Sequence, residues 1–287
     1  MRIRTDVKAN YRAIFFAGKT IRQRINSSIQ ISSPEFAEIE DVAINNKCFA
    51  NCPYCYTSAM STGQNFENIV DKAYKVWGKR SLNNRPFQIA IGGAGESTLH
   101  PDWIEFVKTV NSLDIMPNYT TNGMHLSEDI LLATEQYCGG VAVSYHPHIE
   151  KVFHQSINVL SELKTILNAH IIIGNEESLE SLKTLYQQYK EKIKYFVLLP
   201  YQSVGRASKI ETHNTWDNLF KWISSLEKSE HEKFAYGANF YNYLKENKQE
   251  LNIDMYEPEI YSGYRIFNDS FMDLRCSSYN LNLKERV

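Results

Sequence analysis

The stretch from Asn45 to Tyr56 has the sequence Asn-Asn-Lys-Cys-Phe-Ala-Asn-Cys-Pro-Tyr-Cys-Tyr. It places Cys48, Cys52 and Cys55 in a Cys-x3-Cys-x2-Cys spacing on one short segment. Because each residue of an extended chain reaches only about 3.3–3.6 Å, three thiols this close in sequence are able to converge on one metal centre. The spacing therefore predicts a metal-binding loop, around which the rest of the sequence is arranged.

A fourth local ligand does not accompany the three cysteines. The residues that follow are Tyr56, Thr57 and Ser58, with no His, Asp or further Cys within reach. Structural zinc is closed by four protein ligands, whereas catalytic metal sites keep one position open. Iron–sulfur clusters also usually take four thiolates. Three thiolates therefore suggest a cubane cluster with one iron left for a ligand that is not protein. The alternatives are a zinc site or chance clustering.

The triplet, with Tyr54 directly before its last cysteine, resembles the signature of the radical S-adenosylmethionine (SAM) enzymes. The resemblance implies a [4Fe–4S] cluster on Cys48, Cys52 and Cys55, with SAM chelating the fourth iron and Tyr54 touching its adenine. It also implies an electron donor such as flavodoxin or ferredoxin. One electron then cleaves SAM to methionine and a 5′-deoxyadenosyl radical, which abstracts hydrogen from a substrate.

Length and composition limit the class of protein. The chain has 287 residues, enough for one large α/β domain or two smaller ones. Its hydrophobic fraction of 43% and charged fraction of 22% are ordinary for a soluble globular protein. A net charge of −2 gives no electrostatic reason to expect a nucleic-acid or anionic-membrane partner. No apolar run approaches the roughly 20 residues that span a bilayer, and no signal-peptide core is recognised near the start.

Cysteine usage predicts a reducing compartment. The chain has five cysteines, of which Cys138 and Cys276 stand apart from the loop. An odd count in this arrangement is not the framework of a disulfide-stabilised secreted protein. We therefore expect a cytoplasmic protein, as an oxygen-sensitive cluster would also require. Cys138 precedes a predicted strand and is expected in the core.

Beyond residue 41 the sequence alternates short apolar runs with amphipathic helices. Strand centres from the second to the sixth are separated by about 24–29 residues, the size of a compact βα unit. Six such units predict parallel strands with crossover helices outside, and they are too few for the usual eight-stranded barrel. We therefore predict an α/β fold, a partial (β/α)6 barrel, which the radical SAM resemblance also implies. The expected strands are Val42–Asn45, Phe87–Ile91, Met116–Thr120, Val141–Ser144, His170–Ile173 and Tyr195–Leu199.

Three regions are expected along the chain. Residues 1–40 form an N-terminal extension, in which Tyr11–Phe16 and Thr20–Ile25 flank a glycine turn and predict a hairpin. Residues 41–230 form the radical SAM core. Residues 231–287 form a small C-terminal cap of mixed structure, with Phe234–Phe240, a helix over Asn242–Glu250 and the aromatic-rich Tyr256–Phe271.

In parallel α/β barrels the chemistry lies at the C-terminal ends of the strands. The second strand is followed by Gly92–Glu96, with the sequence Gly-Gly-Ala-Gly-Glu, whose glycines allow a ligand to approach the backbone closely. The segment resembles the family's Gly-Gly-Glu motif and implies that Gly93, Gly95 and Glu96 hold the amino group of SAM. Ser97 stands where many members have proline. Alone, the segment is equally consistent with a plain tight turn.

The next three strand ends carry further family-like residues. Asn122 belongs to a Thr-Asn-Gly segment that lines the family's pocket, and Ser144 ends the fourth strand, where the family often contacts SAM. Gly174 lies in a partial match to a Gly-x-Ile-x-Gly-x-x-Glu pattern that packs adenine, with His170 in place of the first glycine. Taken singly, each of these residues is more typical of an ordinary loop, but the strand ends carry them in the family's order.

After the sixth strand, Tyr201 is expected beside the adenine, and Arg206 lies in a Gly-Arg-Ala turn similar to that of several peptide- and cofactor-maturing members. A peptide or protein side chain is therefore the expected substrate, and a small metabolite or nucleotide is the alternative. An alternative of a different class is a zinc-binding interaction protein without catalysis. Cys276 is a candidate hydrogen donor to a product radical, against a structural role. His146 and His148 are candidates for proton transfer, or residues of a solvated loop.

Overall fold

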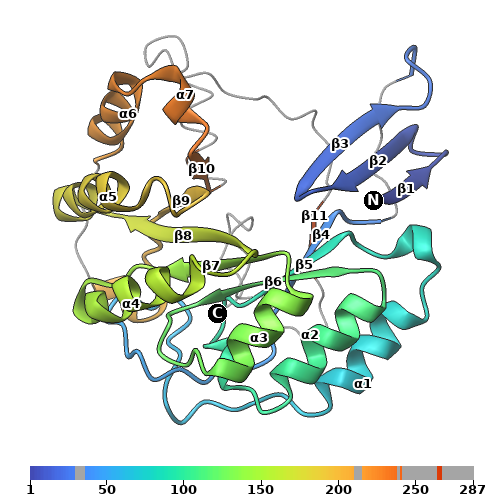
Figure 1. Cartoon of the computed structure of the whole chain (residues 1–287), viewed down its shortest axis with the longest axis horizontal. Helices are drawn as coiled ribbons and strands as arrows, with labels where there is room; N and C mark the ends of the chain where they lie inside the picture. Colours follow the sequence, from blue (N-terminus) through green and yellow to red (C-terminus); the bar gives the residue numbers. More distant parts are fainter. Residues whose placement is uncertain (30–35, 210–214, 238–239, 241–263, 267–287) are drawn as a thin grey trace.

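The computed structural model describes residues 1–29, 36–209, 215–237, 240 and 264–266 (Figure 1). Its N-terminal sheet is antiparallel, with the order β1-β2-β3. The strands are β1 (Arg2–Asp6), β2 (Tyr11–Phe16) and β3 (Lys19–Arg24). Gly18 adopts a φ of 76° in the turn between β2 and β3, a left-handed conformation that glycine accepts without strain. The predicted hairpin is confirmed, and β1 extends it by one strand.

Within the described residues the main sheet has eight strands, in the order β10-β9-β8-β7-β6-β5-β4-β11, and all neighbouring pairs are parallel. Strands β4 to β9 follow one another in sequence order and curl into an open half-barrel (Figure 1). The predicted partial (β/α)6 barrel is therefore confirmed. The strands are β4 (Ile39–Val42), β5 (Gln88–Ile91), β6 (Met116–Thr121), β7 (Gly140–Ser144), β8 (Ile166–Ile173), β9 (Tyr195–Pro200), β10 (Phe234–Tyr236) and β11 (Tyr264–Ile266).

Helices follow the strands and cover the outer face of the half-barrel (Figure 1). Ser127 caps α3 by accepting a hydrogen bond from the backbone N–H of Ile130, as predicted. Asn175 caps α5 and forms a capping box with Ser178. None of these helices is long and apolar enough to cross a membrane, within the part of the chain that the structure describes. The helices are α1 (Ile69–Ala73), α2 (Trp103–Ser112), α3 (Glu128–Tyr137), α4 (Glu150–Leu160), α5 (Glu176–Tyr189), α6 (Trp216–Ser225) and α7 (Lys228–His231).

The hydrophobic core lies between the outer face of the sheet and these helices. Alternate residues of each strand, such as Ile89 and Ile91 of β5, face the helices because successive side chains of a strand point to opposite sides. Cys138 is 8% exposed and belongs to this core, which confirms its predicted place. Burial raises the pKa of its thiol.

The first core strand differs from its prediction. It was expected at Val42–Asn45, and the structure places it at Ile39–Val42. Glu40 is fully buried there, where its carboxylate accepts hydrogen bonds from Trp77 Nε1 at 2.6 Å and Arg80 Nη1 at 2.8 Å. A buried, paired carboxylate is an accepted exception to an apolar strand face. Because Glu40 interrupts the apolar pattern of β4, a search of the sequence for apolar runs does not find this strand.

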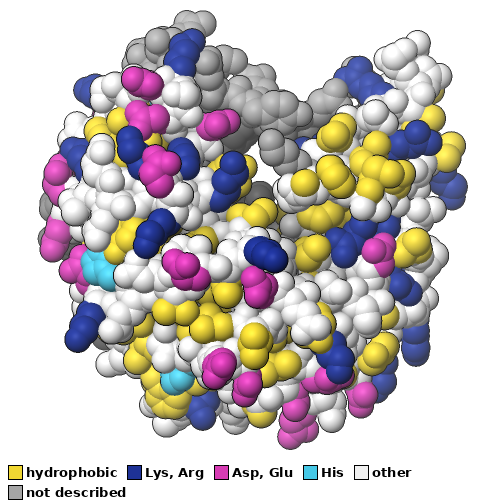
Figure 2. Space-filling model, in the orientation of Figure 1, with side chains coloured by type: hydrophobic (Ala, Val, Ile, Leu, Met, Phe, Trp, Pro, Cys, Tyr) yellow, Lys and Arg dark blue, Asp and Glu magenta, His cyan; other side chains and the backbone are white. Residues whose placement is uncertain are grey.

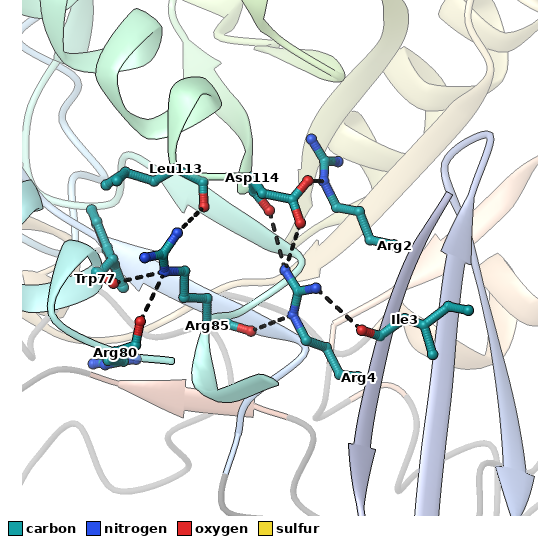
Figure 3. Close-up of polar contacts among 8 residues, drawn as sticks. All are labelled: Arg2, Ile3, Arg4, Trp77, Arg80, Arg85, Leu113 and Asp114. Atoms are coloured by element: carbon teal, nitrogen blue, oxygen red, sulfur yellow. Dashed lines mark hydrogen bonds and ion pairs between the residues drawn. The ribbon is translucent and has the colours of Figure 1, made fainter. Parts of the chain in front are cut away.

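Two arginines of β1 fasten the N-terminal sheet to the core (Figure 3). Arg4, which is 1% exposed, donates from Nη2 to the carbonyl and the carboxylate of Asp114, each at 3.2 Å, and from Nε to the carbonyl of Arg85 at 3.1 Å. Arg2 Nε donates to the other carboxylate oxygen of Asp114 at 2.9 Å. Charge-assisted hydrogen bonds from β1 to Arg85 and Asp114 therefore attach the N-terminal sheet to the core.

The C-terminal region was predicted to form a cap. Within that region, Phe234–Tyr236 forms β10, parallel to β9, and β11 pairs with β4. The predicted helix Asn242–Glu250 and most of the segment Tyr256–Phe271 lie outside the described residues. The division into regions 1–40, 41–230 and 231–287 stays a prediction.

Candidate functional site

The three cysteines of the triplet lie on the loop between β4 and α1, at the C-terminal edge of the half-barrel. All three are free thiols. Cys52 is 8% exposed, and Cys48 and Cys55 are half-buried. The loop turns back on itself through a hydrogen bond from the Cys55 N–H to the Cys52 carbonyl at 3.2 Å. We call residues 48–59 the cysteine loop.

Burial and the neighbouring thiols disfavour the thiolate form of Cys48 and Cys52. Burial, together with the neighbouring thiols of Cys48 and Cys55, raises the pKa of Cys52 to about 12. Burial also raises the pKa of Cys48. The three thiols therefore lie within electrostatic range of one another. Because a metal binds thiolates, metal binding here would release protons.

The donor set fits an iron–sulfur cluster by type and number, because such clusters take thiolates. Within the residues that the structure describes, no group of three or more His, Cys, Asp or Glu side chains is already gathered to hold a metal ion. The three thiols lie on one loop and influence one another electrostatically, but they are not gathered in the geometry of a metal site. The cluster itself stays a prediction.

Arg206 supports the cysteine loop from the far end of the core. Its guanidinium donates from Nε to the carbonyl of Cys52 at 3.0 Å and from Nη1 to the carbonyl of Ala59 at 2.8 Å, and its backbone N–H donates to the carbonyl of Cys55 at 3.1 Å. Gly205 packs so closely that a Cβ atom there would lie 2.3 Å from the carbonyl oxygen of Tyr56. Arg206 was predicted to bind cofactor, and its side chain contacts the backbone of the cysteine loop.

Glu96 lies at the centre of a hydrogen-bond network between two strand ends. Its side chain is 2% exposed. One carboxylate oxygen accepts from Thr98 Oγ1 at 2.7 Å, and the other accepts from the backbone N–H of Asn122 at 2.7 Å. Burial raises the pKa of Glu96, and these two hydrogen bonds oppose the rise. The carboxylate therefore links the loop after β5 to the loop after β6.

The glycine-rich segment is also tied, through its backbone, to the residues that directly precede the cysteine loop. The Glu96 N–H donates to the carbonyl of Lys47 at 2.8 Å, and Asn45 Nδ2 donates to the carbonyl of Glu96 at 2.7 Å. A Cβ atom on Gly95 would lie 2.6 Å from the Lys47 carbonyl oxygen, so only glycine fits. Gly93 has a φ of 85°, which also favours glycine.

Two side chains approach the cysteine sulfurs. Asn122 Nδ2 lies 3.5 Å from Cys48 Sγ, and Thr57 Oγ1 lies 3.3 Å from Cys55 Sγ. Thr57 also donates to the carbonyl of Ala94 at 3.0 Å. Asn122 was predicted for this site from its strand end. Thr57 was not, because its only sequence signal is its position beside Cys55.

A cavity of about 230 Å³ lies beside the cysteine loop. Tyr54, Gly174 and Tyr201, predicted from three separate segments, all line it. A Cβ atom on Gly174 would lie 3.1 Å from the Cβ atom of Tyr201, so glycine lets the two segments pack closely. Ser144 ends β7 and is half-buried, but it does not line this cavity. We call this space the Tyr54 cavity.

His146 and His148 contact the cysteine loop. His146 Nδ1 lies 3.2 Å from the hydroxyl of Tyr54, and His148 Nε2 lies 2.9 Å from the carbonyl of Ala50. Burial lowers the pKa of His146 to about 4, so the ring is neutral at pH 7. Cys276, predicted as a hydrogen donor, lies outside the described residues.

Comparison with known proteins gives matches among solved structures. No family model matches the sequence, and a search of curated proteins finds no match. SuiB of Streptococcus suis bound to S-adenosylmethionine matches with a TM-score of 0.57 and 15% identity, over 71% of this chain and 51% of that chain. SuiB of Streptococcus suis bound to the precursor peptide SuiA matches with a TM-score of 0.59 and 16% identity, over 74% of this chain and 52% of that chain. The structure of anSMEcpe with bound AdoMet and Cp18Cys peptide matches with a TM-score of 0.55 and 13% identity, over 73% of this chain and 65% of that chain.

These neighbours are radical SAM enzymes, and they share the half-barrel with this chain. The resemblance that the cysteine triplet suggested is therefore confirmed at the level of the fold. The chain spans about half the length of the SuiB structures that it matches.

Proposed function

We propose that the chain is a radical SAM enzyme whose Cys48, Cys52 and Cys55 hold a [4Fe–4S] cluster. One observation carries the proposal: three free thiols share a loop at the C-terminal edge of a parallel half-barrel, where such folds place their chemistry. Arg206 and Gly205 contact the backbone of this loop, and Tyr54 of the same loop lines the Tyr54 cavity.

Cluster and SAM, when bound, would supply a 5′-deoxyadenosyl radical that takes hydrogen from a substrate. The chain's own residues would orient SAM and exclude water. Backbone groups of Gly93 and Gly95 and the carboxylate of Glu96 would hold its methionine end. The Tyr54 cavity, formed with Gly174 and Tyr201, has an aromatic wall suited to the adenine ring.

Asn122 and Ser144 complete the proposed pocket. Asn122, the first residue after β6, reaches Cys48 with its side-chain amide and so connects the loop after β6 to the cysteine loop. Ser144 ends the neighbouring strand β7, from which its hydroxyl would face SAM. Arg206 would act on the same site by fixing the carbonyls of Cys52 and Ala59.

A peptide or protein side chain is the proposed substrate. Its support is the Gly-Arg-Ala turn at Arg206, together with two structural neighbours whose structures contain a precursor peptide and the Cp18Cys peptide. An electron donor such as flavodoxin or ferredoxin would reduce the cluster. The same chemistry on a small metabolite or nucleotide is the alternative, which an untargeted substrate screen separates from the first.

Anaerobic reconstitution tests the proposal. The purified chain is incubated with iron and sulfide, and iron is counted before SAM and dithionite are added. We expect a brown protein with about four irons per chain that forms 5′-deoxyadenosine. Cys52→Ala should lose both properties, while Cys138→Ala, which alters a core cysteine outside the loop, should keep them. A colourless, zinc-loaded protein, or full iron content in Cys52→Ala, contradicts the proposal.

A further inference from the structure

Three large hydrophobic side chains are exposed on the cysteine loop and its neighbours. The exposed fraction is 44% for Phe49, 56% for Met60 and 39% for Met124. Phe49 lies between the first two cysteines of the triplet, Met60 follows the cysteine loop, and Met124 belongs to the loop after β6. Single hydrophobic residues scattered over a surface are ordinary, whereas a contiguous group indicates an interaction site.

Contacts around Phe49 join these residues into one group. The Lys47 Nζ atom lies 5.4 Å from the centre of the Phe49 ring, and the ring of His125, directly after Met124, lies 5.7 Å from it on another side. Lys47 also forms a β-bridge with Met60. We call Lys47, Phe49, Met60, Met124 and His125 the Phe49 patch.

The Phe49 patch adjoins the first cysteine of the triplet. Cys48 lies between Lys47 and Phe49 in the chain and is half-buried, and its backbone N–H donates to the carbonyl of Met60 at 3.0 Å. None of the five residues of the patch lines the Tyr54 cavity. A partner on the Phe49 patch would therefore approach Cys48 without entering the cavity proposed for the adenine of SAM.

The charge of the patch indicates the sign of its partner. Among all residues of the segments 43–66 and 115–127, which supply the patch, Lys47 is the only Lys, Arg, Asp or Glu. The helices in the lower half of Figure 2 differ, because hydrophobic side chains are interspersed there with acidic and basic ones. An acidic partner would be attracted by Lys47 and would meet no carboxylate from either segment.

We infer that the Phe49 patch is the docking surface for a small acidic electron-transfer protein that reduces the cluster. The inference rests on the proposed function, because it requires a cluster on Cys48. In this step the redox group of the donor loses one electron and the cluster gains it, with no bond made or broken. Electron transfer slows steeply with distance, so contact beside a cysteine ligand favours it. Such complexes are weak and bury less than about 1,200 Å², which suits a patch of this size.

Direct binding tests the surface. The probes are a purified acidic flavodoxin and a purified acidic ferredoxin, each oxidised and titrated by calorimetry into the full iron-loaded chain at low salt. We expect saturable binding of at least one, weakened by added salt because salt screens the attraction, and the tighter probe identifies the flavin or the iron–sulfur donor. Met60→Glu should raise Kd about tenfold, whereas Met60→Lys, of similar size and opposite charge, should bind as tightly as the unaltered chain or more tightly.

A matched control comes from the other end of the half-barrel. Leu82 is 53% exposed and begins the short helix Leu82–Asn84 before β5, so Leu82→Glu should leave Kd unchanged. Absence of saturable binding of both probes would overturn the inference. Equal Kd values for Met60→Glu, Met60→Lys and the unaltered chain would overturn it as well.

The choice of reductant separates docking from radical chemistry. With limiting reduced flavodoxin or ferredoxin, Met60→Glu should form 5′-deoxyadenosine more slowly than the unaltered chain. With dithionite, a small reductant that needs no docking surface, the two rates should agree. Equal slowing with both reductants would contradict docking at the patch. If the unaltered chain forms no 5′-deoxyadenosine with dithionite, the proposed function fails and this inference with it. Dithionite activity combined with an unchanged Kd in Met60→Glu contradicts the docking surface alone.

Discussion

The contact between Arg206 and the cysteine loop leads to a quantitative prediction for Arg206→Met. The substitution keeps the length of the side chain and removes two hydrogen bonds from a charged donor, to the carbonyls of Cys52 and Ala59. Each is worth about 1.5–3 kcal/mol, and we take the lower value because the guanidinium is half-buried. The free energy needed to open the cysteine loop should then fall by about 3 kcal/mol, which raises the population of the open loop roughly 100-fold.

Thiol labelling measures this opening directly. In a Cys48→Ser/Cys55→Ser background, the rate at which a thiol reagent modifies Cys52 reports the open loop, because Cys52 is 8% exposed when the loop is closed. Peptide mapping separates it from the remaining cysteines. We expect labelling about 100-fold faster in Arg206→Met, with Arg12→Met, an exposed arginine of β2, as the matched control. Cys52 labelling rates that differ by less than about twofold with and without Arg206→Met would refute the assigned role of Arg206.

Three other predictions concern stability. Arg4→Met should lower the free energy of unfolding by about 2–4 kcal/mol, because Asp114 and the Arg85 carbonyl lose a buried donor; urea denaturation measures it, with Lys8→Met as control, and equal midpoints would contradict it. Burial raises the pKa of Glu96 above its ordinary value of 4.5, so its contribution to stability is complete below that value and is lost as pH rises through the folded pKa. In Glu96→Gln the free energy of unfolding should therefore fall less steeply with rising pH than in the unaltered chain. Parallel plots of unfolding free energy against pH for the two proteins would count against this reasoning. Asn175→Ala removes the cap of α5 and should cost about 1 kcal/mol, seen as faster amide exchange in the first turn of that helix but not in α3.

The half-barrel could be predicted because its signals are local. Apolar runs at regular intervals marked β5 to β9 within a few residues, and Ser127 marked the start of α3. The errors have physical causes. β4 was displaced because Glu40 interrupts its apolar pattern and is stabilised only by distant partners, Trp77 and Arg80. The pairing of β10 with β9 was not predicted, because three residues do not show which sheet edge they join.

The roles of the predicted site residues stay predictions, and their contacts could not be predicted from the sequence. Tyr54, Gly174 and Tyr201 meet at one cavity, as their positions after three strands suggested. The restraint of the cysteine loop by Arg206 depends on a contact between residues 154 positions apart, which no local pattern encodes.

The long separation between Cys52 and Arg206 has a consequence during protein synthesis. A ribosome that adds about 5–20 residues per second needs roughly 8–30 s to cover the 154 positions between them. Throughout that interval the nascent thiols lack the arginine that later fixes their loop. They are then most exposed to oxidants and to stray metal ions, so the emerging chain depends on reducing surroundings well before it is complete.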